Sequence, residues 1–312
     1  MSKTKLPSVS FFQFEPLCWF VEKPDEGRVE NNFVGGYSSG SSNTRVYVTA
    51  DGLMVLDLCE YEDAGEILLD IDNKDGDSIL KANLENRSKV ANCLRSTIIS
   101  NTLIEKDISL ELSQPITISN IKTCPDVRYP LNFGIIEGER ELVIDRNVLG
   151  DAVMKFERMA ENRTYLDICN LIYKAHWEFS QGNFTNALIE SWTVIEKMIN
   201  MKWEGFIDKC KSKGVPINSR RKDKLTNGSV FSAYALSEFL SLSGLIDHEK
   251  YKKISEIRGV RNKWMHNMVQ ASDETAAKAL TLSTDMYSEQ MGFPYRLPIT
   301  LSVQVVTVTN RH

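Results

Sequence analysis

From about Gly150 onward, apolar residues recur at helical spacing in long segments that contain little Gly or Pro. The clearest segment is 184–210, where one helix stripe holds Leu188, Trp192, Ile195 and Ile199. Further helices are expected over 150–180, 230–242, 247–269 and 272–290, the last starting after Ser272. Stripes of this kind are buried by packing helix against helix, so we expect a helical bundle here.

The residues before this point have a different pattern. Segments 8–22, 44–49, 66–72 and 108–118 are typical of strands, and Asp51-Gly52 predicts a hairpin turn after 44–49. Only 78–103 has helical spacing, while 299–309 alternates like a strand that returns to the same sheet. We therefore predict an α+β chain of three parts: a mixed, mostly-β domain at 1–147, a helical bundle at 148–292 and a C-terminal strand or tail at 293–312.

Charge divides the chain in the same way. Residues 1–150 carry 15 Lys and Arg against 24 Asp and Glu, whereas residues 151–312 carry 22 against 18. Two stretches of the second part are basic: 202–224 has eight basic residues against three acids, and 249–266 has six against two. This asymmetry favours a polyanionic partner for the second part alone, although a solvated loop and helix face would have the same composition.

Several classes of protein are disfavoured. No run of 18 apolar residues is present, so we expect no membrane-spanning helix. Pro7, Gln13, Glu15 and Pro16 interrupt the apolar start, which we do not interpret as a signal peptide. The six cysteines are at least 31 residues apart, so no CxxC pair predicts a metal site. We expect reduced thiols, a cytoplasmic location and no cofactor.

Common catalytic motifs are also missing. Gly35–Gly40 lacks the lysine that ends a phosphate-binding loop, so we interpret it as a flexible loop. Neither a GxSxG nor an HExxH motif occurs. Of the four histidines, His312 is the last residue and is set aside, His176 is expected to pack beside Trp177, and His248 is expected to be exposed at a helix start. His266 is left as the candidate for acid–base chemistry.

His266 belongs to the segment ISEIRGVRNKWMHNMVQ, which starts at residue 254. At 100° per residue from Ile254, an apolar stripe forms between about 240° and 320°. Its members are Ile257, Val260, Trp264 and Met268. A polar stripe of Arg258, Asn262 and His266 falls at about 40°, 80° and 120°, and Arg261 lies near the edge of the apolar stripe. Arg261 and His266 are thus about 140° apart on one straight helix.

Arg261-Asn262-Lys263-Trp264-Met265-His266 matches the Rx4–6H pattern of the HEPN superfamily (higher eukaryotes and prokaryotes nucleotide-binding domains), in its RNxxxH form. The earlier segment ALIESWTVIEKMINM resembles the aromatic- and glutamate-containing second helix of that family. The resemblance covers about 150–290 and implies a metal-independent endoribonuclease that acts as a homodimer, often a toxin or antiviral-defence effector.

In that interpretation, Arg261, Asn262 and His266 carry the chemistry. A histidine can act as base or acid near neutral pH, and an arginine fork matches the oxygens of a phosphate. Further RNA contacts are expected from Arg258, Lys263, Arg220, Arg221 and Lys222. The acidic first part would bind a regulatory trigger, restrain activity or choose the target. The alternative is a non-catalytic HEPN-like module that binds RNA, a nucleotide or a partner protein, and a weaker one is a structural oligomerisation domain.

Overall fold

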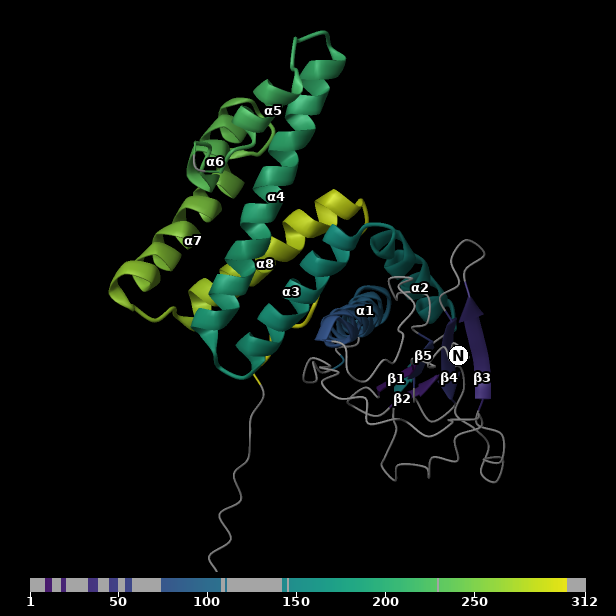
Figure 1. Ribbon diagram of the computed structural model, residues 1–312. Coiled ribbons are helices and arrows are strands. Elements are labelled where there is room, and N and C mark those ends of the chain that lie inside the picture. Colours follow the sequence, from purple (N-terminus) through teal and green to yellow (C-terminus); the bar gives the residue numbers. More distant parts are fainter. Residues whose placement is uncertain are drawn as a thin grey trace, which may run out of the picture. The chain divides into compact units, whose positions relative to one another are not determined.

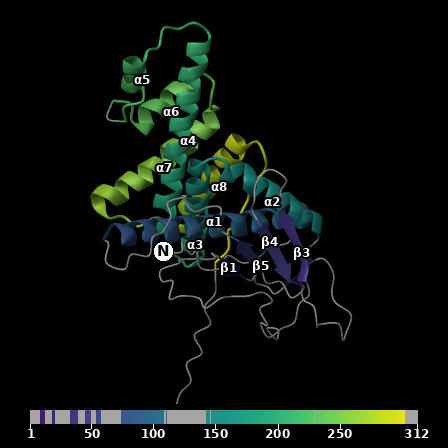
Figure 2. The same ribbon diagram turned by 45° about the vertical axis from the view of Figure 1, so that its right-hand side comes forward.

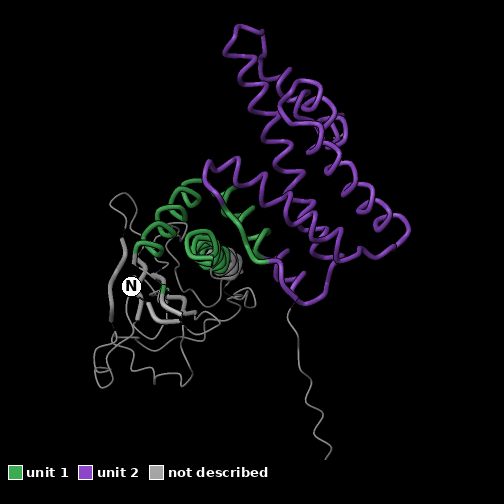
Figure 3. The backbone as a smooth tube through the Cα atoms, turned by 180° about the vertical axis from the view of Figure 1, so that it is seen from behind, with its two compact units in different colours: residues 1–173, 295–298 green, residues 174–294, 299–312 purple. Residues whose placement is uncertain are grey.

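The computed structural model describes residues 9–12, 18–20, 33–38, 45–49, 54–57, 74–107, 110, 142–144, 146–228 and 230–301. Side chains are described for 88–107, 110, 144, 147–228 and 230–301. The chain packs into two compact units, one of residues 1–173 with 295–298 and one of residues 174–294 with 299–312 (Figure 3).

The first unit contains short strands. A four-stranded antiparallel sheet has the order β1 (Val9–Phe12), β5 (Met54–Asp57), β4 (Arg45–Thr49) and β3 (Phe33–Ser38). A separate parallel pair joins β2 (Cys18–Phe20) to β6 (Leu142–Ile144). The β4–β5 pairing agrees with the hairpin expected around Asp51-Gly52. The prediction of a flexible loop over Gly35–Gly40 is wrong for residues 35–38, because these residues belong to β3. Gly35 pairs with Val48 and Gly36 with Tyr47, and the register shifts between Phe33 and Gly35.

The first helix of this unit is longer than the expected 78–103. Helix α1 (Lys74–Lys106) has 33 residues, and all of residues 90–102 are buried. It packs on α2 (Arg146–Ala160), where Asn101 donates from Nδ2 to the carbonyl of Val148 over 2.7 Å. It also reaches the start of α3 (Arg163–Ser180), where Asn92 donates from Nδ2 to Oδ1 of Asn170 over 3.1 Å.

The predicted α+β class, with a mostly-β first domain and a C-terminal strand, is therefore wrong. The strands are three to six residues long, far shorter than α1, and from residue 88 to 301 the described residues lie mainly in helices. The expected strand at 108–118 lies outside the described residues apart from Leu110, which has no strand structure, and the one expected at 66–72 lies entirely outside them. Aromatic and β-branched composition predicted strands here, but such propensity is weak beside tertiary packing.

The predicted C-terminal strand is wrong for its described residues, because 293–301 has no regular secondary structure. Phe293, Tyr295 and Leu297 are buried in alternation, as in a strand, yet no strand pairs with them among the described residues. Instead, the backbone N–H of Arg296 donates to the hydroxyl of Ser100 over 2.8 Å. The remainder of the expected strand, 302–309, lies outside the described residues.

In its described part, the second unit consists of helices joined by turns and loops (Figure 1). It contains the end of α3 and then α4 (Phe184–Ser212), α5 (Ser219–Leu225), α6 (Ala233–Leu242), α7 (His248–Asn267) and α8 (Asp273–Met291). Helix α4 is central and packs on α6, α7 and α8. Between α3, α4 and α8 lies a cluster of buried apolar side chains: Ala175, Phe179, Ala187, Ala276 and Leu280.

Candidate functional site

The candidate site lies on α7, which is one continuous helix with defined ends. At its start, Asp247 accepts a hydrogen bond from the backbone N–H of Lys250 over 2.7 Å, as an N-cap carboxylate does. At its end, Met268 is left-handed with φ 55°, and its N–H donates to the carbonyl of Trp264 over 2.8 Å. Since the helix ends there, Met268 is 70% exposed, and its predicted place in the buried stripe is wrong.

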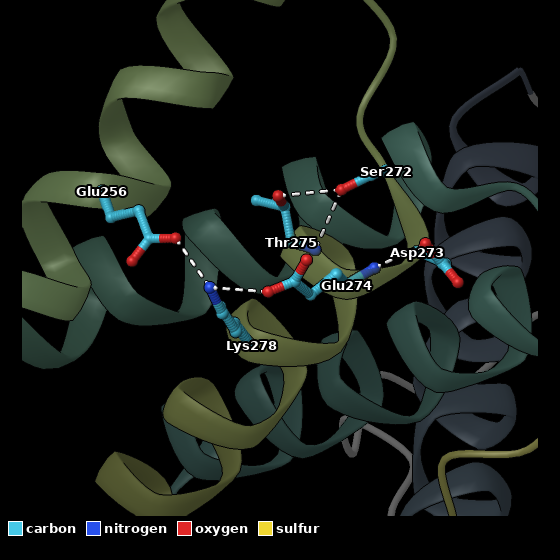
Figure 4. Close-up of polar contacts among 6 residues, drawn as sticks. All are labelled: Glu256, Ser272, Asp273, Glu274, Thr275 and Lys278. Carbon is cyan, nitrogen blue, oxygen red and sulfur yellow. Dashed lines mark hydrogen bonds and ion pairs between the residues drawn. The ribbon is translucent and has the colours of Figure 1, made fainter.

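Neighbouring helices hold α7 on two sides. Towards α6, the Tyr251 hydroxyl donates to Glu238, and the guanidinium carbon of Arg258 lies 4.1 Å from the ring centre of Tyr234. Figure 4 shows the α8 side, where Lys278 bridges Glu256 of α7 at 2.9 Å and Glu274 of its own helix at 3.1 Å.

The start of α8 is fixed locally, as Figure 4 also shows. Ser272 accepts from the backbone N–H of Thr275 over 3.2 Å, and Asp273 accepts from that of Glu274 over 2.8 Å. The helix start predicted at Ser272 is thus confirmed. Because these caps set where α8 begins, they also set where Lys278 meets α7.

Arg261 and Asn262 interact directly on the last turns of α7. Arg261 donates from Nη1 to Oδ1 of Asn262 over 3.1 Å, and both residues are half-buried. His266 is exposed and has no hydrogen-bond partner among the described residues. The structure therefore joins Arg261 to Asn262 and leaves His266 apart, about 140° around the helix from Arg261.

The carboxylates of α7 are paired, and several of its cations are not. Glu249 pairs with Lys252 at 2.9 Å, and Glu256 pairs with Lys278. Among the described side chains, four cations of α7 have no carboxylate partner: Lys253, Arg258, Arg261 and Lys263. The C-terminal half of this helix consequently carries positive charge that no acid in the described part of the chain neutralises.

The other expected RNA contacts lie on α5. Arg220 and Arg221 are exposed, and Arg221 donates from Nη1 to the carbonyl of Pro216 over 2.7 Å. Lys222 forms an ion pair with Asp208 at 2.8 Å, and this hydrogen bond raises the pKa of Lys222. Arg220 and Arg221 thus remain available to a polyanion, whereas Lys222 is already paired.

The structure does not bring α5 and the end of α7 together. Near α5, Lys222 contacts Asp208 in the last part of α4. Beyond the end of α7, the backbone N–H of Ala271 donates to the hydroxyl of Thr185, at the start of α4, over 3.0 Å. At 1.5 Å per residue, Thr185 and Asp208 are about 35 Å apart along α4, and Figures 1 and 2 both show α5 and the end of α7 at opposite ends of that helix.

Apolar side chains are exposed beside His266. Met265 is 51% exposed, Met268 70% and Val269 48%. Neighbouring exposed apolar residues, unlike scattered ones, are typical of surfaces that are covered by a partner.

Sequence reasoning missed a partly buried acid on α4. Burial, the largest cause, and the charge of Glu178 on α3 together raise the pKa of Glu190 to about 7, against the opposing effect of Lys174. One carboxyl oxygen of Glu190 is buried and has no hydrogen-bond partner among the residues that the structure describes. The contact of Tyr234 with Arg258 was also missed, because it joins two helices and leaves no spacing signal in the sequence.

His176 and His248 lie as expected, whereas His312 lies outside the described residues. His176 is buried with its Nε2 3.4 Å from the hydroxyl of Thr284, and His248 is exposed at the first residue of α7. Among the described residues, no three His, Cys, Asp or Glu side chains are grouped where they could hold a metal ion. The helices of the described part are all too short or too polar to cross a membrane.

Comparisons of this chain with models of protein families, with curated proteins and with solved structures find no match.

Proposed function

We propose that the second unit is a metal-independent endoribonuclease of HEPN type, and that the protein is a cytoplasmic toxin or antiviral-defence effector. Its main support is α7, which carries the RNxxxH pattern, an exposed histidine and four cations without acid partners among the described residues. The basic, exposed Arg220 and Arg221 support RNA as the polyanion.

In this proposal, the 2′-hydroxyl of one nucleotide attacks the adjacent phosphorus. The O2′–P bond forms as the P–O5′ bond breaks, which leaves a 2′,3′-cyclic phosphate and a 5′-hydroxyl. His266 takes the proton of the attacking 2′-hydroxyl or gives a proton to the leaving O5′, and water makes the other of these two transfers. Arg261, oriented by Asn262, binds the non-bridging oxygens, on which charge develops.

The separation of Arg261 from His266 around α7 supports a site that is shared by two chains. A two-fold axis beside α7 would bring Arg261 of each chain towards His266 of the other, because such an axis places the same patch on both sides. The exposed Met265, Met268 and Val269 supply apolar surface for that contact. The first unit would then restrain or trigger this pair of helices.

The proposal is tested by incubating the purified chain with end-labelled RNA in excess EDTA. We expect 2′,3′-cyclic phosphate products from the wild type and a loss of about 100-fold or more for His266→Ala. The matched control is His248→Ala, which removes another exposed histidine from the same helix and should cleave normally. Intact RNA with the wild type, or full activity of a folded His266→Ala variant, would reject the proposal.

The second candidate is a non-catalytic module that binds RNA, a nucleotide or a partner protein. It is favoured by the separation of Arg261 from His266 around one continuous helix. Its signature is RNA binding by the wild type without any cleavage.

A further inference from the structure

The α6–α7 contact has the composition of a base-binding surface. Arg258 lies over the Tyr234 ring at 4.1 Å from its centre, and the tyrosine remains 44% exposed. Aromatic rings and arginine planes are the groups on which unpaired bases stack. Arginine–aromatic pairs also occur in many proteins as purely structural contacts. The residues around this pair therefore decide whether it could bind a ligand.

Arg258 is the cation of the pair, and its guanidinium contacts the Tyr234 ring. Arg258 has no carboxylate partner among the described residues. Glu238, which lies one turn after Tyr234 on α6, is engaged by the Tyr251 hydroxyl. The positive charge of Arg258 is therefore set against a ring and not against an acid.

The pair also lies next to the proposed phosphate site. Arg258 precedes Arg261 by three residues and Asn262 by four, so the three side chains neighbour one another on successive turns. One helical turn rises about 5.4 Å, a separation that a base and its own phosphate can span. A strand whose phosphate meets Arg261 can thus place a neighbouring base at Tyr234.

We infer that Tyr234, with Arg258 stacked on it, is a subsite for an unpaired RNA base beside the cleaved phosphate. This inference rests on the proposed function. It assigns the subsite a preference for single strands, because a base inside a duplex has no free face to stack on the ring.

Binding is measured in a His266→Ala background, by fluorescence anisotropy with a labelled 12-nucleotide single strand and with the same sequence in a duplex. Tyr234→Ala should weaken single-strand binding by at least about fivefold and leave duplex binding unchanged, whereas Tyr234→Phe should bind normally. Phe239→Ala is the matched control, because Phe239 is an aromatic residue of α6 with 46% exposure that stacks on Trp203 instead of a cation. Its single-strand affinity should equal that of the background protein.

Salt dependence separates stacking from charge. Arg258→Ala should flatten the plot of log affinity against log salt, while Tyr234→Ala should lower affinity without changing the slope. The subsite alone is overturned if the wild type cleaves RNA but Tyr234→Ala binds the single strand with unchanged affinity. It is also overturned if Phe239→Ala loses as much single-strand affinity as Tyr234→Ala. Absence of both RNA binding and cleavage by the wild type overturns the proposed function and the subsite with it.

Discussion

Arg261 and Asn262 are joined by a hydrogen bond of 3.1 Å from the guanidinium to the amide oxygen, so one turn of α7 fixes the direction of its own cation. In the proposed reaction this makes Asn262 a positioning residue that acts through Arg261. A hydrogen bond to a charged group contributes about 1.5 kcal/mol or more.

We therefore expect Asn262→Ala to lower kcat/KM for RNA by about tenfold. Asn262→Asp should be worse, because a carboxylate beside Arg261 neutralises the charge that binds the phosphate. Asn262→Gln, which keeps an amide oxygen within reach of the guanidinium, serves as the conservative control. Steady-state kinetics check the order of the three variants, and equal activity of the alanine and aspartate forms would contradict it.

The shared cleft is tested by mixing chains. Wild type is refolded with an equal amount of His266→Ala so that dimers assort at random. If both chains serve one cleft, only wild-type pairs act and activity per total protein falls to about one quarter. A value near one half, or full activity from a monomer, would show that each chain acts alone.

Arg220 and Arg221 should matter only for longer RNA. They lie on α5, about 35 Å along α4 from the end of α7, which about ten stacked nucleotides would span. We expect the Arg220→Ala/Arg221→Ala double variant to bind a 25-nucleotide strand more weakly and with a flatter salt slope, and to bind a six-nucleotide strand as the wild type does. Equal effects on both lengths would contradict this separation.

Glu190 predicts how stability varies with pH. Its folded pKa of about 7 exceeds the ordinary 4.5, so the folded form holds the proton more tightly. Stability should be highest below pH 4.5 as far as this group is concerned, and fall as the pH rises through 4.5 to 7. Because Glu190 is partly exposed, we expect its ionisation to lower the free energy of unfolding by only about 1 kcal/mol. A loss of this size lowers Tm by about 2–4 °C.

Glu190→Gln removes that loss and should raise Tm at pH 8 by a few degrees relative to the wild type, with little change at pH 4.5. Glu196→Gln, at another half-buried glutamate of α4, is the control and should leave the pH dependence in place. Thermal melts followed by circular dichroism give both comparisons. A Glu190→Gln variant with the same pH profile as the wild type would refute the assignment.

Local signals predicted most of the helices in the second half of the chain. Helices α4, α7 and α8 match the expected segments 184–210, 247–269 and 272–290 within two residues at each end. The match is close because the spacing of apolar residues and the capping residues are signals between near neighbours in the sequence. The expected helix over 150–180 is instead two, α2 and α3, separated at Glu161 and Asn162. Asn162 accepts from the backbone N–H of Thr164 over 2.9 Å, a signal that the sequence did contain.

Contacts between distant residues could not be predicted in this way. The buried face of α1 includes polar side chains such as Asn92 and Asn101, whose partners Asn170 and Val148 lie 78 and 47 residues away. Alternation in 293–301 matches a strand, but the partner of Arg296 is the side chain of Ser100. On α7, spacing predicted the angular positions of Arg261 and His266, whereas the stacking of Arg258 on Tyr234 depends on how α6 packs.

The contribution of residues 295–298 to the first unit has a consequence for synthesis on the ribosome. Ser100 and Cys169 emerge from the ribosome long before Arg296 and Tyr295, their hydrogen-bond partners, are translated. The nascent chain completes all of 174–294 in the interval, so the helices of the inserted unit can fold while the surrounding unit is unfinished. A stop codon just after α8 would leave every helix of α4–α8 translated, yet deprive the first unit of its closing segment.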